Sequence, residues 1–307
     1  MPNPVDIAII GSGPAGMAAA LYAGRAGKET VIIEKAYPGG QAFTTYMIEN
    51  YPGIKKIGGP DFTQSLSEQA LSFGTKMITN EVISVDLQTN PKEISFADGS
   101  TLEAKAIILA MGAVAKKLDV PGEEKFTGMG VSYCATCDGA FFKERHIVVV
   151  GGGDSALEEA LFLTRFAAKV TVLHRRNEFR AAQVLQDRVR NHPKIEIKTP
   201  FISKEVVGER KISALKVQNV ETGAEELISC DGVFVYVGFT PMTQLALGQV
   251  EMDKNYIVAN DATMETSIPG VYAAGDLRVK KLRQIVTAVA DGALAATSAD
   301  HWLESKE

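Results

Sequence analysis

Short apolar runs, glycine-rich turns and amphipathic stretches follow one another near the start of the chain. The apolar run at 6–10 leads into the turn GSGPAG (11–16), a small-residue stretch (17–26) and a second apolar run, TVIIE, at 30–34. Continuous apolar runs of this length are typical of buried strands, and small residues let a helix lie close to a sheet. Gly27 suits the end of that helix. The pattern predicts strand, turn, helix and strand.

The same pattern recurs in the second half of the chain. HIVVV (146–150) precedes GGGDSA (151–156), an amphipathic stretch at 157–168 and the run KVTVLH (169–174). The spacing from Gly11 to Glu34 is 34 − 11 = 23 positions, and from Gly151 to His174 it is 174 − 151 = 23. The chain therefore carries two similar nucleotide-binding units, one in each half.

Alternating apolar and polar positions follow each unit. Residues 81–110 alternate in this way and predict a β-meander, and residues 195–234 repeat the texture before the run DGVFVYVG (231–238). A further strand is expected at 270–275, and residues 284–303 have helical periodicity. The predicted fold is α/β with two Rossmann-like domains of three-layer ββα type. Candidate linkers, which contain glycine and proline, lie at 112–124 and 238–248.

The two glycine turns differ at the position that distinguishes dinucleotides. A GxGxxG turn lets the backbone approach a pyrophosphate, although a single copy can also be only a tight turn. Glu34 ends the first unit's second strand and suits a ribose with a free 2′-hydroxyl, as in FAD or NAD. The second unit has His174, Arg175 and Arg176 there, followed by Arg180, which favours the 2′-phosphate of NADPH over NADH. A solvated basic loop is the alternative.

Asp276 would show which unit binds FAD. It follows the expected strand at 270–275, where its carboxylate can bond a ribityl hydroxyl, although Gly-Asp also occurs in simple turns. Two dinucleotide sites in one chain imply electron transfer between the two nucleotides.

Composition and charge narrow the class of protein. The chain has 307 residues, 46% of them hydrophobic and 22% charged, with a formal net charge of −5. These values are ordinary for a soluble protein of two domains, and the acidic body argues against nucleic acid or an anionic membrane as partner. We expect no signal peptide before the first strand, and the apolar runs are too short to cross a bilayer. Three cysteines do not form a disulfide scaffold, so a cytoplasmic setting is expected.

Two of those cysteines form the motif CATCDG (134–139). The spacing of Cys134 and Cys137 lets the sulfurs alternate between dithiol and disulfide, and a helix opening here and running on to Arg145 would favour a thiolate. Asp138 follows directly and is interpreted as a proton carrier. Zinc is not favoured because there is no second CxxC or CxxH, and Cys230 is predicted to lie in the core.

Several motifs together resemble those of one family. They are GSGPAG, GGQ (39–41), IENYPG (48–53), CATCDG, GGGDSA, HRRNEFRA (174–181), SIPGVYAAGD (267–276) and RQIVTAVADG (283–292). With these the chain resembles, nearly end to end, the low-molecular-weight, bacterial-type thioredoxin reductases of the FAD/NADPH pyridine nucleotide-disulfide oxidoreductases. It departs from their usual pattern at AMG (110–112), TPM (240–242) and Ile285.

The resemblance implies a domain organisation and a set of site residues. Residues 1–114 and 245–307 would form a discontinuous FAD domain, and residues 115–244 an inserted NADPH domain that carries the CxxC pair. The residues expected at FAD are Gly11, Ser12, Gly13, Pro14, Ala15, Gly16, Glu34, Lys35, Gly39, Gly40, Gln41, Asn50, Gly112, Gly275, Asp276, Arg283, Gln284 and Ile285. Those expected at NADPH are Gly151, Gly152, Gly153, Asp154, Ser155, Ala156, His174, Arg175, Arg176 and Arg180.

The resemblance also implies a reaction. Hydride would pass from NADPH to FAD and then to the Cys134–Cys137 disulfide, with Cys137 facing the flavin, Cys134 attacking thioredoxin and Asp138 serving as acid and base. The family is homodimeric and swings one domain against the other. The alternative acceptor is another small disulfide protein, of a peroxiredoxin system or glutaredoxin-like. A dithiol oxidase and a non-catalytic nucleotide sensor are the further rivals, and the NADPH and CxxC motifs disfavour them.

Overall fold

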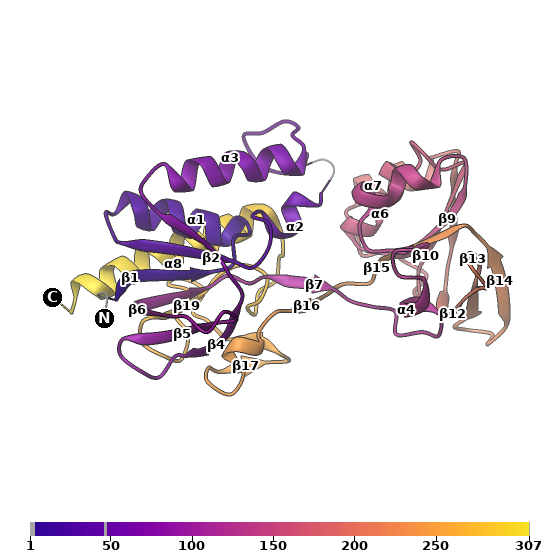
Figure 1. Ribbon diagram of the computed structural model, residues 1–307. Helices are drawn as coiled ribbons and strands as arrows, with labels where there is room; N and C mark the ends of the chain where they lie inside the picture. The colour runs from indigo at the N-terminus through magenta and orange to yellow at the C-terminus, as the bar shows by residue number, and fades with distance from the viewer. Residues whose placement is uncertain (1–3, 46–47, 307) are drawn as a thin grey trace. The chain divides into compact units, whose positions relative to one another are not determined.

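The computed structural model describes residues 4–45 and 48–306, which divide into two compact units (Figure 1). The first unit contains the described residues up to Val114 and those from Pro241 onwards, and the second contains Ala115–Thr240. The return to the first unit thus comes at Pro241 rather than at residue 245. One reason is that the Met242 N–H donates a hydrogen bond to the Gly112 carbonyl, 2.9 Å away in the same unit.

The first unit is built on a mixed sheet. Its strands are β1 (Val5–Ile10), β2 (Thr30–Glu34), β3 (Lys76–Thr79), β4 (Val82–Asp86), β5 (Lys92–Phe96), β6 (Thr101–Leu109) and β19 (Val271–Ala273). They pair in the order β3-β2-β1-β6-β5-β4, and β19 pairs with β6 as well. The pairs among β3, β2, β1, β6 and β19 are parallel, whereas β4, β5 and the start of β6 form the expected antiparallel meander.

Alternate residues of β1 enter different hydrophobic layers. Ile7 and Ile9 pack with α1 (Pro14–Arg25) and α8 (Ile285–Glu304), whereas Ala8 and Ile10 pack with the meander side chains of β4 and β5. Both sets are apolar because both faces of the sheet are covered. The result is the helix–sheet–meander layering that the sequence predicts.

Small residues let α1 and α8 pack closely on that sheet. A Cβ added to Gly292 of α8 would lie 2.0 Å from the Ala15 carbonyl oxygen of α1. The other helices of this unit are α2 (Gly40–Phe43), α3 (Gly59–Leu71) and the 3₁₀ turn η2 (Gln244–Ala246), and the hairpin strands are β17 (Met252–Asp253) and β18 (Tyr256–Ile257).

The second unit repeats this plan. Its strands are β8 (Val131–Ser132), β9 (His146–Gly151), β10 (Lys169–Leu173), β11 (Ile195–Lys198), β12 (Phe201–Gly208), β13 (Ile212–Asn219), β14 (Glu225–Ser229) and β15 (Gly232–Tyr236). The parallel sheet has the order β11-β10-β9-β15-β8, and β12-β13-β14 form a separate antiparallel sheet. The order β11-β10-β9-β15-β8 matches β3-β2-β1-β6-β19, so the internal repeat that the sequence predicts is present in the fold.

The two helices predicted in the second unit have other bounds than expected, and the one predicted over 157–168 runs over Asp154–Leu163. The helices of this unit are α4 (Glu123–Phe126), α5 (Ala135–Asp138), the 3₁₀ turn η1 (Gly139–Phe142), α6 (Asp154–Leu163) and α7 (Gln183–Arg190). The prediction of one helix from CATCDG to Arg145 is wrong, because α5 gives way to η1 at Gly139 and Lys143 leaves helical geometry with ψ 130°. Glu144 then has φ +57°, which no right-handed helix accommodates.

The chain passes between the units at β7 (Ala113–Ala115) and β16 (Phe239–Pro241), which pair as a two-stranded sheet. Within the described part of the chain, every helix is too short or too polar to cross a lipid bilayer.

Candidate functional site

The glycine turn after β1 brings the start of α1 against the sheet. Gly11 has φ +104°, and a Cβ there would lie 2.5 Å from the Ala110 carbonyl oxygen. A Cβ on Gly16 would lie 1.9 Å from the Gly11 carbonyl oxygen. Both positions therefore require glycine. The N–H groups of Ala15 and Gly16, in the first turn of α1, have no acceptor within their own helix and are suited to bind an anion.

A cavity of about 590 Å³ opens at the carboxyl ends of the parallel strands of the first unit. This is the edge at which open α/β sheets bind their ligands. Many of the residues predicted for FAD line it, namely Gly11, Ser12, Gly13, Pro14, Ala15, Glu34, Lys35, Gly40, Gln41, Gly112, Gly275 and Asp276. The volume lies within the usual range of cofactor pockets.

Glu34 holds the two strand ends of this cavity together. Its carboxylate accepts hydrogen bonds from the Ser12 hydroxyl (2.6 Å), the Ser12 N–H (3.2 Å) and the Ala36 N–H (3.1 Å). These bonds fix the orientation of an acidic group in the lining, which is where a ribose hydroxyl of an ADP moiety would find its acceptor.

Asp276 presents an unused acceptor to the same cavity. Its Oδ1 is buried and has no hydrogen-bond partner among the residues that the structure describes. Burial raises the pKa of Asp276, while the positive charges of Lys280 and Arg283 act in the opposite direction. A buried acceptor without a partner costs free energy, so a ligand hydroxyl that donates to Oδ1 is favoured. The site therefore fits the ribityl chain of FAD.

Arg283 supports the loop that follows Asp276. Its guanidinium donates to the carbonyl oxygens of Asp276 (3.3 Å), Arg278 (3.2 Å) and Lys280 (3.4 Å). It also lies over the Tyr256 ring, with its Cζ 4.2 Å from the ring centroid. Arg283 thus contacts the backbone around the cavity rather than forming part of the lining.

Two other predicted FAD residues meet at the start of α8. The Asn50 side-chain amide donates to Gln284 Oε1 at 3.0 Å, and Gln284 forms a capping box with Thr287. Ile285 is the first residue of α8. Gly39, another residue predicted to contact FAD, is the N-cap of α2 and has φ +116°. It shapes the backbone there and does not line the cavity.

Part of the cavity lining was not predictable from the sequence. One wall consists of Asn80 and Glu81, which join β3 to β4, and of Val82 and Ile83, the first two residues of β4. No motif marks this segment, because its place at the cavity follows only from the pairing of β3 with β2. Met111, one of the departures from the family pattern, also lines the cavity.

The glycine turn of the second unit is packed around a buried histidine. His174 is only 6% exposed. A Cβ added to Gly152 would lie 2.4 Å from the His174 ring. Burial lowers the pKa of His174, and nearby arginine charges act in the same direction. Its Nε2 is buried without a partner within the described residues. The structure thus separates His174, beneath the turn, from the arginines that follow it.

Arg175, Arg176 and Arg180 are exposed on the loop after β10. The Arg180 N–H donates to the Gly152 carbonyl at 2.8 Å, and the Asp154 carboxylate accepts the Ala182 N–H at 2.7 Å. These bonds hold the arginine loop beside the glycine turn and the start of α6. Guanidinium groups beside a helix N-terminus are suited to a 2′-phosphate together with a pyrophosphate.

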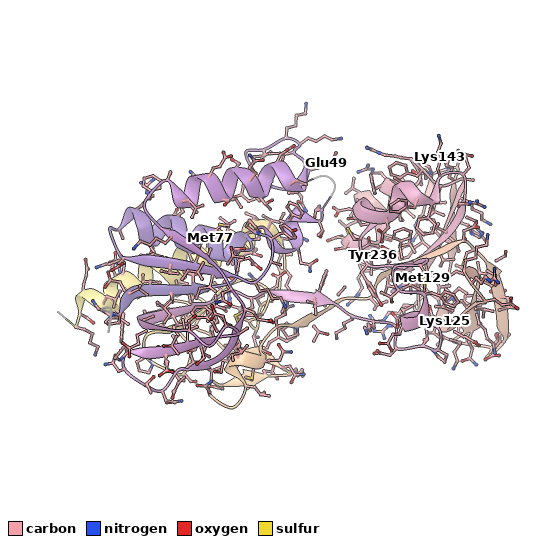
Figure 2. All side chains as sticks on the ribbon, viewed as in Figure 1. Glu49, Met77, Lys125, Met129, Lys143 and Tyr236 are labelled. Carbon is pink, nitrogen blue, oxygen red and sulfur yellow. The ribbon has the colours of Figure 1, made fainter. Side chains whose placement is uncertain are left out.

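The dithiol motif lies in this second unit. Cys134 is disulfide-bonded, and the side chain of Cys137 lies outside the described residues. The Cys134 N–H donates to Ser132 Oγ at 3.0 Å. The next N–H, that of Ala135, donates at 2.8 Å to the hydroxyl of Tyr236, the residue labelled in Figure 2. The backbone that carries Cys134 is therefore fixed from two sides.

Asp138 ends α5 and is half-buried. Its N–H donates to the Cys134 carbonyl at 3.2 Å, so it lies one helical turn from that cysteine. The third cysteine, Cys230, is 4% exposed in the core of the unit, as predicted. Burial raises its pKa to about 12, so its thiol is not reactive near neutral pH.

A buried carboxylate steadies the segment before Cys134. Glu123 accepts the N–H groups of Leu118 and Asp119 and the hydroxyl of Tyr133, each at 2.7 Å. Burial and the Glu123 carboxylate raise the pKa of Tyr133 to about 12. Sequence patterns did not point to this clamp, since its members are joined only by side-chain contacts.

The chain is similar to known proteins over almost its whole length. The family model described as pyridine nucleotide-disulphide oxidoreductase matches residues 5–292. The thioredoxin reductase of Listeria monocytogenes is 47% identical over 302 residues, covering 97% of this chain and 94% of that protein. That of Rickettsia felis is 46% identical, covering 97% of each. The crystal structure of Lactococcus lactis thioredoxin reductase superposes with a TM-score of 0.95 at 41% identity, covering 98% of this chain and 99% of that one.

Proposed function

The chain belongs to the pyridine nucleotide-disulphide oxidoreductase family, and from this premise we propose how it acts as a thioredoxin-disulfide reductase. It is an NADPH-dependent flavoprotein that uses FAD and NADPH. The observation that carries this function is the bonded Cys134 within CATCDG, in a chain whose thioredoxin reductase relatives match it nearly end to end.

We propose that FAD occupies the cavity of the first unit. The free N–H groups at the start of α1 would hold its pyrophosphate, Glu34 its adenosine ribose and Asp276 its ribityl chain. The support is the cavity of about 590 Å³ and the buried, unpartnered Asp276 Oδ1. When bound, FAD supplies a carrier that accepts two electrons from a nicotinamide and passes them to sulfur.

We propose that NADPH binds at the glycine turn of the second unit. The exposed Arg175, Arg176 and Arg180 would bind the 2′-phosphate, and the start of α6 would bind the pyrophosphate. His174 would act from beneath, since its buried ring supports the turn at Gly152.

The reaction at sulfur takes three steps. Two electrons break the Cys134–Cys137 disulfide and leave one thiolate and one thiol. Asp138 carries the proton to and from these two sulfurs. The Cys134 thiolate then attacks one sulfur of the thioredoxin disulfide, forming a mixed disulfide and releasing a thioredoxin thiolate that takes up a proton. Cys137 attacks Cys134 Sγ, which restores the Cys134–Cys137 bond and releases reduced thioredoxin.

We propose that thioredoxin docks beside the dithiol segment of the second unit. Phe141 follows α5 closely in the chain and is 81% exposed, and Met129, just before β8, is exposed as well (Figure 2). Exposed large apolar side chains of this kind are typical of protein interaction sites. We also propose a homodimer in the cytoplasm, on the basis of the family resemblance and the few cysteines.

The test compares three cysteine variants in NADPH-dependent reduction of thioredoxin. Cys134→Ser and Cys137→Ser are each expected to lower turnover by roughly three orders of magnitude, because both sulfurs are needed in every cycle. Cys230→Ala is the matched control and should retain activity, since Cys230 lies in the core of the unit. Normal thioredoxin reduction by Cys137→Ser would contradict the scheme. Reduction of a glutaredoxin-like protein, with no reduction of thioredoxin, would favour the alternative acceptor.

A further inference from the structure

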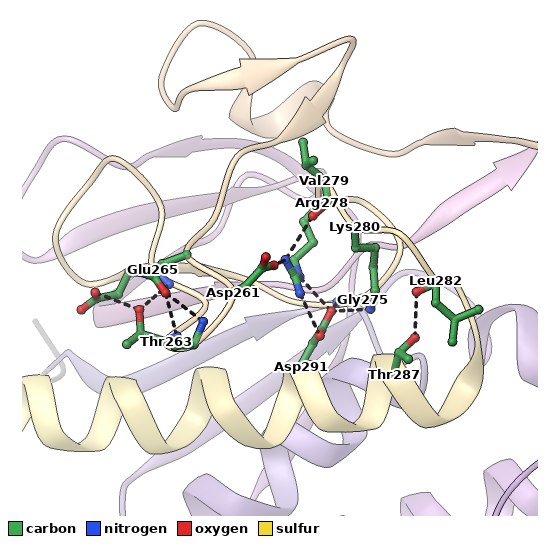
Figure 3. A network of polar contacts seen from close by, with 12 residues as sticks. Asp261, Thr263, Glu265, Gly275, Arg278, Val279, Lys280, Leu282, Thr287 and Asp291 are labelled. Atoms are coloured by element: carbon green, nitrogen blue, oxygen red, sulfur yellow. Dashed lines mark hydrogen bonds and ion pairs between the residues drawn. The ribbon is translucent and has the colours of Figure 1, made fainter.

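Asp291 of α8 lies at the centre of a buried polar network (Figure 3). Its Oδ2 accepts hydrogen bonds from Arg278 Nε (2.9 Å), Lys280 Nζ (2.6 Å) and the Gly275 N–H (3.0 Å). Its Oδ1 accepts one from Arg278 Nη2 at 3.2 Å. A single carboxylate therefore contacts three residues of the loop that joins β19 to α8.

The charges of this network depend on one another. The side chains of Arg278, Lys280 and Asp291 are only 6%, 6% and 7% exposed. Although burial alone opposes its ionisation, the bonds from Arg278 and Lys280 hold the pKa of Asp291 below its ordinary value. Asp291 therefore remains charged, and it pairs with both buried cations, Lys280 and Arg278. The Arg278 guanidinium also pairs with the Asp261 carboxylate, 2.7 Å away.

The same loop carries Asp276. Gly275, which donates its N–H to Asp291, directly precedes Asp276 and has φ +89°, a conformation that glycine adopts readily. Arg278 and Lys280 follow Asp276 by two and four positions. The bonds to Asp291 thus fix the backbone on both sides of Asp276, whose Oδ1 is buried without a partner at the cavity.

We propose that Asp291 is a positioning residue for FAD: by holding Gly275, Arg278 and Lys280, it presents the Asp276 carboxylate to the cofactor. It touches neither the flavin nor the substrate and acts only through the loop. The inference rests on the proposed binding of FAD in this cavity. Flavin affinity, rather than disulfide reduction, is the property that it predicts.

The experiment measures the dissociation constant of FAD from the apoprotein by quenching of flavin fluorescence. Asp291→Asn keeps the size of the side chain but removes the charge, and its amide would face donors. We expect the dissociation constant to rise roughly 10- to 100-fold, the effect of losing hydrogen bonds to a charged group. Asp300→Asn is the matched control, because it breaks an ion pair of the same helix with Lys28 (3.0 Å) at another place. It should change the constant less than about threefold.

A second comparison distinguishes positioning from general structural support. If Asp291 acts through Asp276, then Asp291→Asn should raise the constant less than about threefold in an Asp276→Ala background. The same full factor in both backgrounds, or no effect of Asp291→Asn in the wild-type background, would overturn the inference. If the wild-type apoprotein failed to bind FAD, the proposed cofactor itself would be wrong, which is a different outcome.

Folding is checked first by circular dichroism of each apoprotein, because an unpaired buried cation is strongly destabilising. If Asp291→Asn does not fold, the variant R278M/K280M/D291N replaces it in both comparisons. This variant leaves no unpaired buried charge and lacks the bonds that Arg278 and Lys280 donate to residue 291, so a loss of flavin affinity is again expected. Wild-type affinity in that variant would equally overturn the inference.

Discussion

Glu159 of α6 makes the stability of the protein depend on pH in a way that one substitution should remove. Burial, together with the neighbouring charge of Glu158, raises the pKa of Glu159 from an ordinary value of 4.5 to about 7. The folded state therefore holds a proton on Glu159 that the unfolded chain releases at lower pH. Between about pH 4.5 and pH 7 stability is lost as the pH rises, and above the folded pKa the loss is complete.

The size of the effect follows from the two pKa values. The interval from 4.5 to about 7 corresponds to at most about 3 kcal/mol, and the side chain's partial exposure reduces this to about 1–3 kcal/mol. Gln at this position has no charge to bury. Glu159→Gln should therefore gain stability over the wild type progressively from about pH 5 to about pH 8.

The assay is urea unfolding of wild type and variant across this pH range, read as the difference between their free energies of unfolding. Other titrating groups cancel in that difference. Glu158→Gln is the matched control, because it removes an exposed charge one residue away and should flatten the pH dependence only slightly. A difference between Glu159→Gln and wild type that stayed constant from about pH 5 to about pH 8 would refute the reasoning.

Three further variants test the NADPH site, the packing of α8 and the docking surface. Arg175→Ala combined with Arg176→Ala should lower kcat/KM for NADPH roughly 30- to 100-fold and leave kcat/KM for NADH nearly unchanged. Equal losses for the two nucleotides would contradict the assignment of these arginines to the 2′-phosphate. Gly292→Ala should destabilise the apoprotein by at least about 2 kcal/mol in thermal unfolding, because the added Cβ would lie 2.0 Å from the Ala15 carbonyl oxygen. A melting temperature equal to that of the wild type would count against this packing. Phe141→Ser should raise KM for thioredoxin roughly five- to tenfold at constant kcat, whereas an unchanged KM would place the docking surface elsewhere.

The parts of the fold that local sequence controls were predictable. Gly11 and Gly16 mark the turn after β1 because any Cβ there would meet backbone atoms, and this restriction is visible in the sequence as GSGPAG. The spacing between Gly11 and Glu34 likewise reflects the fixed length of a strand–helix–strand unit, so its recurrence at Gly151 predicted the second sheet.

Features that depend on contacts between distant segments were not predictable. The sequence places His174 with the arginines of HRR, yet its ring is buried against Gly152 because β10 ends directly beside the turn after β9. Asp291 belongs to a motif that the sequence connects only with family membership. Its bonds to Arg278 and Gly275 arise because α8 packs beside the end of β19, which no local pattern encodes.

The helix predicted from CATCDG shows a limit of another kind. Residues 141–145 (FFKER) are compatible with a helix, but the chain must turn at Glu144 to enter β9. The requirement comes from the position of the sheet, which outweighs local helical preference.

The central claim is that two electrons pass from NADPH through FAD to the sulfur pair that includes Cys134. Anaerobic addition of NADPH in excess of two equivalents to the FAD-loaded protein tests it most directly, with flavin absorbance and titratable thiols followed together. The account predicts that the yellow colour bleaches and that new thiols appear in the wild type, and that Cys134→Ser bleaches without generating them. Flavin that stays oxidised in the presence of NADPH, or that bleaches in the wild type without any new thiol, would contradict the account.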